Sequence, residues 1–339
     1  MTAKKINVAL IGLGRMGKIH FRHLRQAIPG VSVVAVSDAM QKKEAFEKEF
    51  GNIFFTNNAD EAINHPGVDA VVICTPASSH AELVDKAISK KKNIFCEKPL
   101  DLSLEKTDSL LKKAKEAGIK LMLGFNRRFD PEFAQAKKMT GEGKIGNPQI
   151  IKITNRDPGI PPVEFIKTSG GMFMDFSIHD FDMIRYIMNK KVTEIFAKGL
   201  VFMDPAVGEA GDIDTALISV TFEDGTYAVI DNSRKAIYGY DQRMEIFGDG
   251  GMIQVENNLY HRNIVSDEKG IHHALPLNNF TERYTNSYLK EMEFFIDALV
   301  NNKELPVTGE DMLIATIMAY AAKKSMEEGR PVKLTEIKW

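Results

Sequence analysis

Cysteine is scarce in this chain, which has only Cys74 and Cys96 among its 339 residues. Both lie in short apolar runs typical of buried strands, where a thiol acts as a small core side chain. A disulfide framework is therefore not expected. An excess of one charge is also lacking, because 44 Lys and Arg face 46 Asp and Glu. The resulting net charge of -2 argues against a nucleic-acid partner.

Long hydrophobic runs are missing as well. No stretch of about 18 apolar residues occurs, so no membrane span is expected. The N-terminus lacks the apolar core and cleavage site of a secretory leader, which makes the cytoplasm the expected location. A zinc site recruiting His80, His272 and His273 is a weak alternative, because the chain contains no C-x-x-C pair. We expect no metal.

The length suits two domains rather than one core. In the first third, short apolar runs alternate with amphipathic stretches, which is typical of a parallel sheet with helices on both faces. The expected strands are 6–13, 32–38, 69–75, 93–96 and 120–125. The expected helices are 16–27, 41–50, 59–64, 79–91 and 104–117.

The pattern changes after about residue 126. Apolar and polar residues then alternate with period two in the expected strands, which are 149–155, 215–222, 226–232, 243–247 and 252–256. The expected helices are 174–188, 283–300 and 310–328. The chain is thus expected to comprise an α/β Rossmann domain over residues 1–126 and an α+β domain over 127–339. The second domain would hold a large, mainly antiparallel open sheet.

A G-x-G-x-x-G motif, formed by Gly12, Gly14 and Gly17, follows the first strand and opens the first helix. In this context the first glycine permits a tight turn, the second lets a pyrophosphate approach the backbone, and the third packs helix on strand. The helix N-terminus then offers N–H groups to the phosphates. Arg15 and Met16 lie inside the motif and are predicted to contact the cofactor with it. A ligand-free glycine turn is the alternative.

Asp38 ends the second expected strand, 21 residues after Gly17. A carboxylate there accepts hydrogen bonds from the ribose hydroxyls and repels a 2′-phosphate, which favours NAD over NADP. Lys42 and Lys43 nearby weaken this preference. Capping of the next helix is an alternative role for Asp38, and the two roles are compatible.

Two further segments follow strands of the expected parallel sheet. Thr75-Pro76, with His80 beyond it, follows one strand, and Glu97-Lys98-Pro99 follows the next. Ligands of open α/β sheets bind beyond the carboxyl ends of the strands. We therefore assign Thr75, Pro76, His80, Glu97 and Lys98 to the cofactor cleft.

A carboxylate and an imidazole lie one turn apart on one expected helix. Asp175 and His179 are spaced i, i+4, and Asp182 lies three residues further, so all three would share a face. Oxidation of an alcohol needs a base for the hydroxyl proton, and a nearby carboxylate can orient or tune a histidine for that role. The alternative is an ordinary Asp–His pair on a half-exposed helix. The glycines and phenylalanines around the pair make the segment unusual for a plain surface.

Together, the glycine motif, Glu97-Lys98-Pro99 and Gly170-Gly171 followed by Asp175-x-x-x-His179 resemble the Gfo/Idh/MocA oxidoreductases. The resemblance runs from Ile6 to about Lys333. Within the family the chain looks most like the inositol 2-dehydrogenases. That likeness is carried by four segments, which are Gly124–Asp130, Asn155–Pro158, Tyr238–Asp241 and Arg283-Tyr284 with Tyr288 and Glu291.

The resemblance implies catalysis by Lys98, Asp175 and His179. His179 would be the general base, Lys98 would polarise the reacting oxygen, and Asp175 would support both. Lys98, Asp175 and His179 would also contact the substrate. Further positions that match a polyol pocket are Asn155, Asp157, Asp182, Tyr240 and Tyr288. Some relatives carry histidine at position 155, which leaves the preferred stereoisomer open. Alternatively, Tyr240 and Tyr288 are residues at the edge of the core. Residues 155–158 are then only a turn that ends a strand.

The leading hypothesis is hydride transfer from C2 of myo-inositol to NAD, giving the 2-keto inositol. One alternative is the same chemistry on scyllo-inositol, glucose or another sugar. A second is a dinucleotide-binding protein without catalysis. The resemblance also implies a homo-oligomer, in which the open sheet often forms the contact surface of a tetramer.

Overall fold

The computed structural model describes residues 5–339, which divide by contacts into two compact units. The first unit contains residues 5–126, Asn286–Ile314 and Trp339. The second contains Arg127–Thr285 and Ala315–Lys338. The expected boundary after residue 126 coincides with the first break. The return of residues 286–314 to the first unit was not foreseen from the sequence.

The first unit is built on a six-stranded parallel sheet with the order β3-β2-β1-β4-β5-β6. This confirms the expected Rossmann architecture. The strands are β1 (Ile6–Ile11), β2 (Val31–Ser37), β3 (Phe54–Thr56), β4 (Ala70–Ile73), β5 (Asn93–Cys96) and β6 (Leu121–Leu123). The three-residue β3 was not predicted, because so short a run carries no periodicity.

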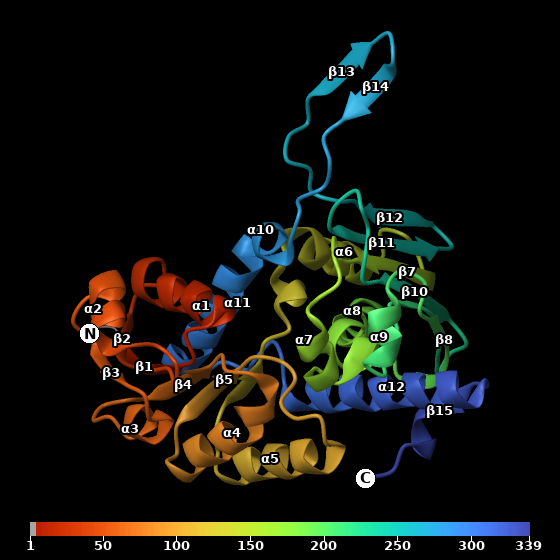
Figure 1. The fold of residues 1–339 in the computed structure, drawn as a ribbon. Coiled ribbons are helices and arrows are strands. Elements are labelled where there is room, and N and C mark those ends of the chain that lie inside the picture. The colour runs from red at the N-terminus through yellow and green to blue at the C-terminus, as the bar shows by residue number, and fades with distance from the viewer. Residues whose placement is uncertain (1–4) are drawn as a thin grey trace. The chain divides into compact units, whose positions relative to one another are not determined.

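Helices cover both faces of this sheet (Figure 1). The helices on the two faces are α1 (Arg15–Gln26), α2 (Lys43–Phe50), α3 (Ala59–Ile63), α4 (His80–Ser89) and α5 (Leu104–Glu116). A short 3₁₀ turn η1 (Ala77–Ser79) precedes α4. Helix α11 (Thr285–Val300) lies on the same face as α1, where Phe295 packs against Phe95 of β5. A helix from late in the chain therefore completes the core of the N-terminal sheet.

The second unit is built on a seven-stranded sheet with the order β12-β11-β7-β10-β9-β8-β15. Neighbouring strands are antiparallel except β7 and β10, which run parallel. The expected mainly antiparallel sheet is thus confirmed. Its strands are β7 (Pro148–Arg156), β8 (Val192–Leu200), β9 (Thr215–Phe222), β10 (Tyr227–Ser233), β11 (Asp241–Gly248), β12 (Gly251–Val255) and β15 (Val332–Lys333).

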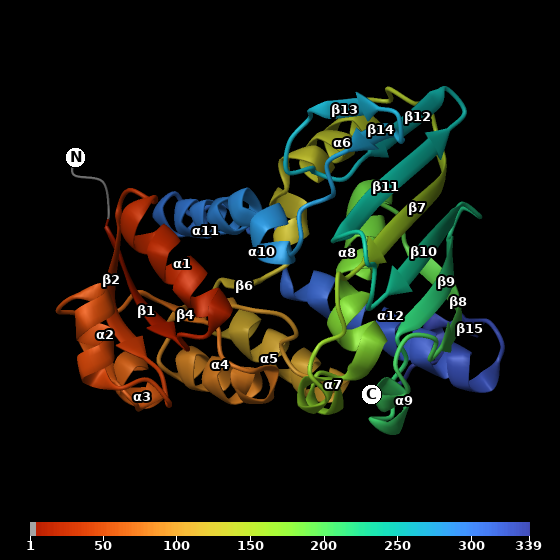
Figure 2. The ribbon, with the colours of Figure 1, turned by 45° about the horizontal axis from the view of Figure 1, so that its top comes forward.

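The helices of this unit gather on one face of its sheet (Figure 2). They are α6 (Pro131–Gly141), α7 (Val163–Thr168), α8 (Ile178–Met188), α9 (Pro205–Glu209) and α10 (Phe280–Arg283), with most of α12 (Gly309–Glu328). Short turns η2 (Asn126–Phe129) and η4 (Leu334–Glu336) complete the regular structure. Ile151, Ile153 and Ile230 of the sheet are buried towards the helices, and intervening residues are more exposed, as period two requires.

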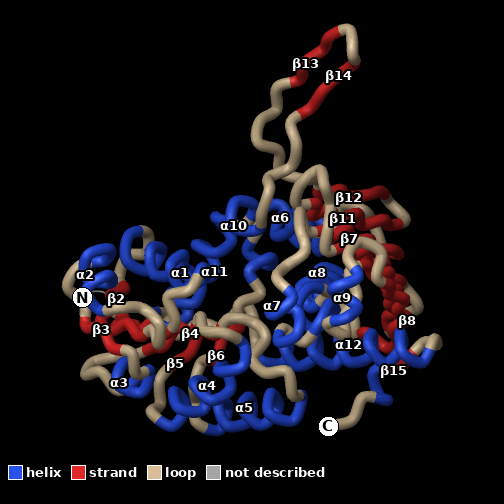
Figure 3. The backbone as a smooth tube through the Cα atoms, in the orientation of Figure 1, coloured by secondary structure: helices blue, strands red, loops and turns tan. Residues whose placement is uncertain are grey.

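A separate hairpin projects from the second unit and consists of β13 (Ile264–Asp267) and β14 (Gly270–His273) (Figure 3). All eight strand residues are exposed. This hairpin was not predicted. Among residues 5–339, no helix combines the length and hydrophobicity that crossing a membrane requires.

The expected helix 174–188 is wrong at its start. A π-helical turn, η3 (Met172–Phe176), comes first, and α8 begins only at Ile178. Asp175 therefore lies on the π turn while His179 lies in the first turn of α8. π-Helical turns are rare and frequent at functional sites, and residue periodicity alone does not distinguish them from α-helix.

Candidate functional site

The glycine motif forms the turn between β1 and α1. Gly12 has φ +93°, and a Cβ there would lie 2.9 Å from backbone atoms of Cys74 and Thr75 at the end of β4. A Cβ on Gly17 would lie 1.9 Å from the carbonyl oxygen of Gly12. A Cβ on Gly14, in contrast, would meet nothing within 4 Å. Two glycines thus hold β1, β4 and α1 together, while the third faces open space.

The N-terminus of α1 fits a bound anion. No side chain caps it, and its first turn contains no acidic residue. Exposed Arg15 begins the helix and half-buried Met16 follows. The positive end of the helix dipole is therefore available to a phosphate beside the exposed Gly14.

Asp38 lies directly beside this loop. Its Oδ2 accepts a hydrogen bond from the Leu13 N–H at 2.7 Å, and its Oδ1 accepts from the N–H groups of Met40 and Gln41, both at 2.9 Å. Helix α2 has Lys42 as its N-cap, so Asp38 stabilises the preceding turn and does not cap that helix. The first of these bonds ties the end of β2 to the glycine loop.

His80 connects the ends of two neighbouring strands. Its Nε2 lies 2.8 Å from the Thr75 carbonyl oxygen after β4, and its Nδ1 lies 2.7 Å from the Pro99 carbonyl oxygen after β5. The side chain is 1% exposed. Half-buried Thr75 and exposed Pro76 form the turn before it. His80 thus orders the segments that carry Thr75 and Lys98, and its predicted direct contact with the cofactor stays a prediction.

Glu97 and half-buried Lys98 follow β5 directly. The Glu97 carboxylate turns inwards, with its Oε1 2.8 Å from the Nε2 of His20 on α1. A Cβ on Gly124 would lie 2.7 Å from its Oε2, so the glycine at that position makes room for the carboxylate. The residue before Lys98 is therefore held on two sides.

In the second unit, Asp175 is held by an arginine that the sequence analysis missed. Nη1 of Arg234 lies 3.5 Å from Asp175 Oδ2, and its Nη2 lies 3.2 Å from Asp212 Oδ2. Asp212 Oδ1 in turn accepts from the N–H of Met172 at 2.9 Å, at the start of the π turn. The buried guanidinium thus orients the carboxylate four residues before His179.

Gly170 and Gly171 serve this same arrangement. Both have positive φ, +88° and +79°. A Cβ on Gly171 would lie 2.8 Å from Asp212 Oδ1. Gly171 therefore leaves room for Asp212, which anchors the turn that carries Asp175.

Asp180, next to His179, is the centre of a buried polar network. It accepts hydrogen bonds from Arg127 Nη1 at 2.7 Å, from Asn155 Nδ2 at 2.8 Å and from Asn232 Nδ2 at 2.9 Å. Gln242 donates to the Asn155 side-chain oxygen and accepts from the Tyr284 hydroxyl at 3.1 Å. Asn155 of β7 is fully buried, and its amide links Asp180 of α8 to Gln242 of β11.

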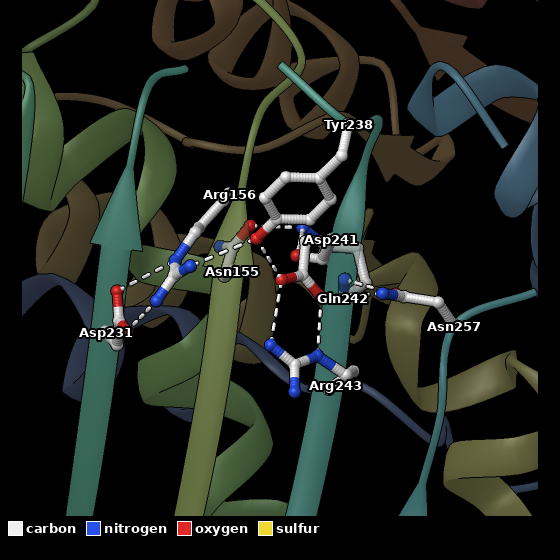
Figure 4. A network of polar contacts seen from close by, with 8 residues as sticks. All are labelled: Asn155, Arg156, Asp231, Tyr238, Asp241, Gln242, Arg243 and Asn257. Carbon is white, nitrogen blue, oxygen red and sulfur yellow. Dashed lines mark hydrogen bonds and ion pairs between the residues drawn. The ribbon is translucent and has the colours of Figure 1, made fainter. Parts of the chain in front are cut away.

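Successive residues on β7 divide between the two faces of the sheet. Asn155 and Gln242 belong to the buried network, while Arg156 bonds Asp231 on β10 and the Tyr238 hydroxyl (Figure 4). That hydroxyl donates to Asp241 Oδ2 at 2.7 Å. The end of β7 is thereby fixed from both faces.

The other predicted substrate residues occupy different surroundings. Asp182 forms a buried two-bonded ion pair with Arg128, including Nε to Oδ2 at 2.8 Å. Half-buried Asp157 exchanges backbone hydrogen bonds with Ser233 and Ala236. The Asp157 contacts fix the backbone after β7, and the Arg128 pair fixes the Asp182 side chain on α8. The substrate roles of Asp157 and Asp182 stay predictions.

The two predicted tyrosines lie in different units. Tyr240 is 5% exposed and packs edge-on against Tyr284, and burial raises the pKa of its phenol well above the usual value. The phenol is therefore neutral and can both donate and accept hydrogen bonds. Tyr288 on α11 packs edge-on against His20 in the first unit. The substrate roles of both tyrosines stay predictions.

Comparison with known proteins agrees with this architecture. Residues 6–125 match a family model described as an oxidoreductase family with an NAD-binding Rossmann fold. Residues 137–334 match the C-terminal alpha/beta domain of the same family. The chain belongs to the Gfo/Idh/MocA oxidoreductases. The resemblance in the glycine, Glu-Lys-Pro and Asp–His motifs is therefore confirmed at the level of the family.

Close relatives of this oxidoreductase cover nearly all of it. It is 43% identical to a myo-inositol 2-dehydrogenase of Thermotoga maritima, over 98% of this chain and 99% of that one. It is 40% identical to an inositol 2-dehydrogenase of Rhizobium meliloti, over 97% and 99%. The solved structure of a scyllo-inositol dehydrogenase from Lactobacillus casei, with bound NAD(H) and scyllo-inositol, matches with TM-score 0.91 and 31% identity over 98% and 100%.

Replacing Arg234 by methionine is expected to destabilise the oxidoreductase strongly. The change leaves Asp175 and Asp212 close together without their buried counter-ion, and breaking a buried pair costs about 3–5 kcal/mol. The urea dependence of unfolding measures this loss. Arg330→Met is the matched control, because its guanidinium pairs with Glu336 at the surface and should shift the midpoint far less. Equal shifts in the two variants would contradict the role of Arg234.

Proposed function

We propose that this oxidoreductase is an NAD-dependent inositol 2-dehydrogenase that converts myo-inositol to its 2-keto product. The observation that carries the proposal is the nearly full-length similarity to relatives named as inositol dehydrogenases. The glycine turn, the uncapped α1 and Asp38 support NAD as the cofactor, because they supply a phosphate site and a ribose partner together.

The proposed mechanism assigns one task to each reactive side chain. His179 removes the proton of the C2 hydroxyl as the hydride leaves the same carbon. Lys98 stabilises the negative charge that develops on the oxygen, and Asp175, fixed by Arg234, supports the imidazolium that forms. Bound NAD supplies the hydride acceptor. The products are the ketone, NADH and one proton.

Scyllo-inositol is the second candidate substrate, because one of the matched structures is a scyllo-inositol dehydrogenase with that ligand bound. The two inositols differ only in the orientation of one hydroxyl. Binding in either case needs donors and acceptors around a ring, as Asp157 and the tyrosines would offer. The choice between them therefore depends on pocket shape.

A substrate panel tests the function directly. The purified protein with NAD should reduce the cofactor fastest, by kcat/KM, with myo-inositol, more slowly with scyllo-inositol, and least with glucose. NADH absorbance follows the reaction. A higher kcat/KM on glucose would remove the inositol assignment, and a higher value on scyllo-inositol would replace the substrate while keeping the chemistry.

The Lys98→Met variant tests the assignment of the lysine. Without the ammonium the developing alkoxide loses its partner, so kcat should fall roughly 100- to 1,000-fold. NAD binding should persist, because the glycine turn and Asp38 remain intact. Stopped-flow turnover and fluorescence titration of NAD measure the two effects. Lys90→Met, at the exposed end of α4, is the control; if both variants turned over like the unmodified protein, Lys98 would have no part in the reaction.

We further propose that the protein acts in the cytoplasm as a homo-oligomer, a tetramer joined through the open sheet face of the second unit. Four apolar side chains lie on the face that the helices leave uncovered. Phe247 pairs with Met252, and both Phe247 and Tyr227 pair with Ile150 of β7. The four side chains are 44–57% exposed, and they are Leu217, Tyr227, Phe247 and Met252. An exposed apolar patch of this kind is typical of a protein interface.

Substitutions that introduce charge on this sheet face test the proposed tetramer. Leu217→Glu combined with Tyr227→Glu would bury carboxylates in the proposed contact, so the tetramer should dissociate to smaller species. Sedimentation velocity gives the mass of each species. Phe165→Glu, a similar exposed change on α7, is the control and should stay tetrameric. A doubly substituted protein of undiminished mass would rule out this face as the contact.

A further inference from the structure

Three acid–base side chains meet inside the first unit, and one of them directly precedes Lys98 in the chain. They are His20 of α1, Glu97 after β5 and Glu291 of α11, and one ring-nitrogen or carboxylate atom of each lies within 4.8 Å of the other two. The side chains of His20 and Glu291 are fully buried, and that of Glu97 is 13% exposed. The sequence analysis assigned no role to His20 or Glu291, although His20 and His23 stand in an H-x-x-H spacing.

The hydrogen bonds within this cluster are unevenly shared. His20 Nε2 lies 2.8 Å from Glu97 Oε1 and 3.8 Å from Glu291 Oε1. Among the described residues, neither carboxyl oxygen of Glu291 has a hydrogen-bond partner. A buried ionised carboxylate without partners would cost several kcal/mol in desolvation. Glu291 must therefore be neutralised within its surroundings.

Those surroundings offer little positive charge to Glu291. Phe95 and Tyr288 pack edge-on against the His20 ring, and the neighbouring thiols of Cys74 and Cys96 are kept neutral because burial raises their pKa. Burial and the nearby His20 lower the pKa of His23 to about 4, so it too is neutral at pH 7. His20 is already committed to Glu97 through the nitrogen that faces both carboxyl groups.

Two carboxyl groups this close in a dry site cannot both be ionised without a cation between them. Burial, followed by the neighbouring Glu97, raises the pKa of Glu291 well above its usual value. A proton on Glu291 removes the repulsion and provides a donor that can turn towards Glu97. The simplest neutralising group is thus one proton.

We propose that Glu291 is a positioning residue that carries a proton at neutral pH, and that it holds Glu97, with His20, so that the adjoining Lys98 is presented for catalysis. The part concerning Lys98 rests on the proposed dehydrogenase function. Glu97 is confined by His20 on one side and by Gly124 on the other, and neutral Glu291 completes this enclosure. Because Glu97 and Lys98 are adjacent, displacement of the first moves the second.

The pH dependence of the free energy of unfolding tests whether Glu291 carries this proton. Since the pKa of Glu291 is raised on folding, the native state holds an extra proton between the unfolded and folded pKa values, and stability falls as pH rises through this window. The unfolding equilibrium constant of the unmodified protein should thus rise up to tenfold per pH unit relative to Glu291→Gln, which has no such proton. Urea unfolding from pH 5 to 9 measures the difference.

Glu293→Gln on the exposed side of α11 is the matched control and should keep the pH dependence of the unmodified protein. Identical pH dependence in the Glu291→Gln and unmodified proteins would overturn the proton assignment. Elemental analysis of the purified protein provides a second check. One tightly bound zinc or manganese ion per chain, lost in Glu291→Gln, would replace the proton by a metal and likewise overturn the proposal.

The positioning role is tested by turnover. Glu291→Ala should lower kcat at least tenfold while the Kd for NAD changes little, and Glu291→Gln should recover most of that loss because it keeps the shape and neutrality of the protonated acid. Equal losses in the two variants would contradict the proposal. If the unmodified protein did not oxidise inositol, the proposed function would fail, whereas the unfolding experiment would still decide the state of Glu291.

Discussion

The contact between the ends of β1 and β4 at Gly12 is the constraint on which the cofactor half of the protein depends. A side chain at Gly12 would collide with the backbone of Cys74 and Thr75, and one at Gly17 would collide with Gly12 itself. The strand, the turn and the helix therefore approach so closely that neither position has room for a side chain. The His80 side chain extends this arrangement from the end of β4 to Pro99, so it helps to fix the backbone beside Lys98.

Charge compensation has the same organising role in the second unit. Four of its buried arginines pair with buried or half-buried aspartates, and the pairs are Arg127–Asp180, Arg128–Asp182, Arg283–Asp130 and Arg234 with Asp175 and Asp212. A buried carboxylate with a guanidinium partner can remain ionised. Glu291 in the first unit faces a second glutamate instead. The contrast between a matched and an unmatched acid is what makes a proton the natural neutralising group there.

The sequence was sufficient for the parallel sheet, because fully buried strands and amphipathic helices carry distinct periodicities. It also singled out the segments that carry Lys98 and Asp175 as candidates, since one follows a strand and the other a pair of glycines. It was not sufficient for the π turn before α8, for the exposed hairpin β13–β14, or for the return of α11 to the first unit. The π turn and the return of α11 depend on contacts between residues distant in sequence, which local pattern does not encode. The hairpin is local, but all its strand residues are exposed, so it lacks the alternation of a half-buried strand.

The same difference between local pattern and tertiary contact applies to individual side chains. Asp175 could be found from its spacing to His179, but Arg234 lies 59 positions further along the chain and nothing local connects the two. Asp180 was overlooked between two more conspicuous residues, although three side chains converge on it. Helical periodicity predicted that Asp182 shares a helix face with His179. Periodicity indicates the side of a helix on which a residue lies, but it does not indicate which residue it bonds. Its bond to Arg128 is a fact of tertiary packing.

Asn155 shows how a buried network can bear on the choice of substrate. Its amide donates to Asp180 and accepts from Gln242, so the position needs one donor and one acceptor pointing in different directions. A neutral imidazole also offers one of each. A histidine substituted at this position could therefore keep both bonds while changing the shape of the side chain. Under the proposed inositol function, such an exchange would alter the space beside Asp180 without disturbing its charge, so the preferred stereoisomer could change while the hydride transfer stayed the same.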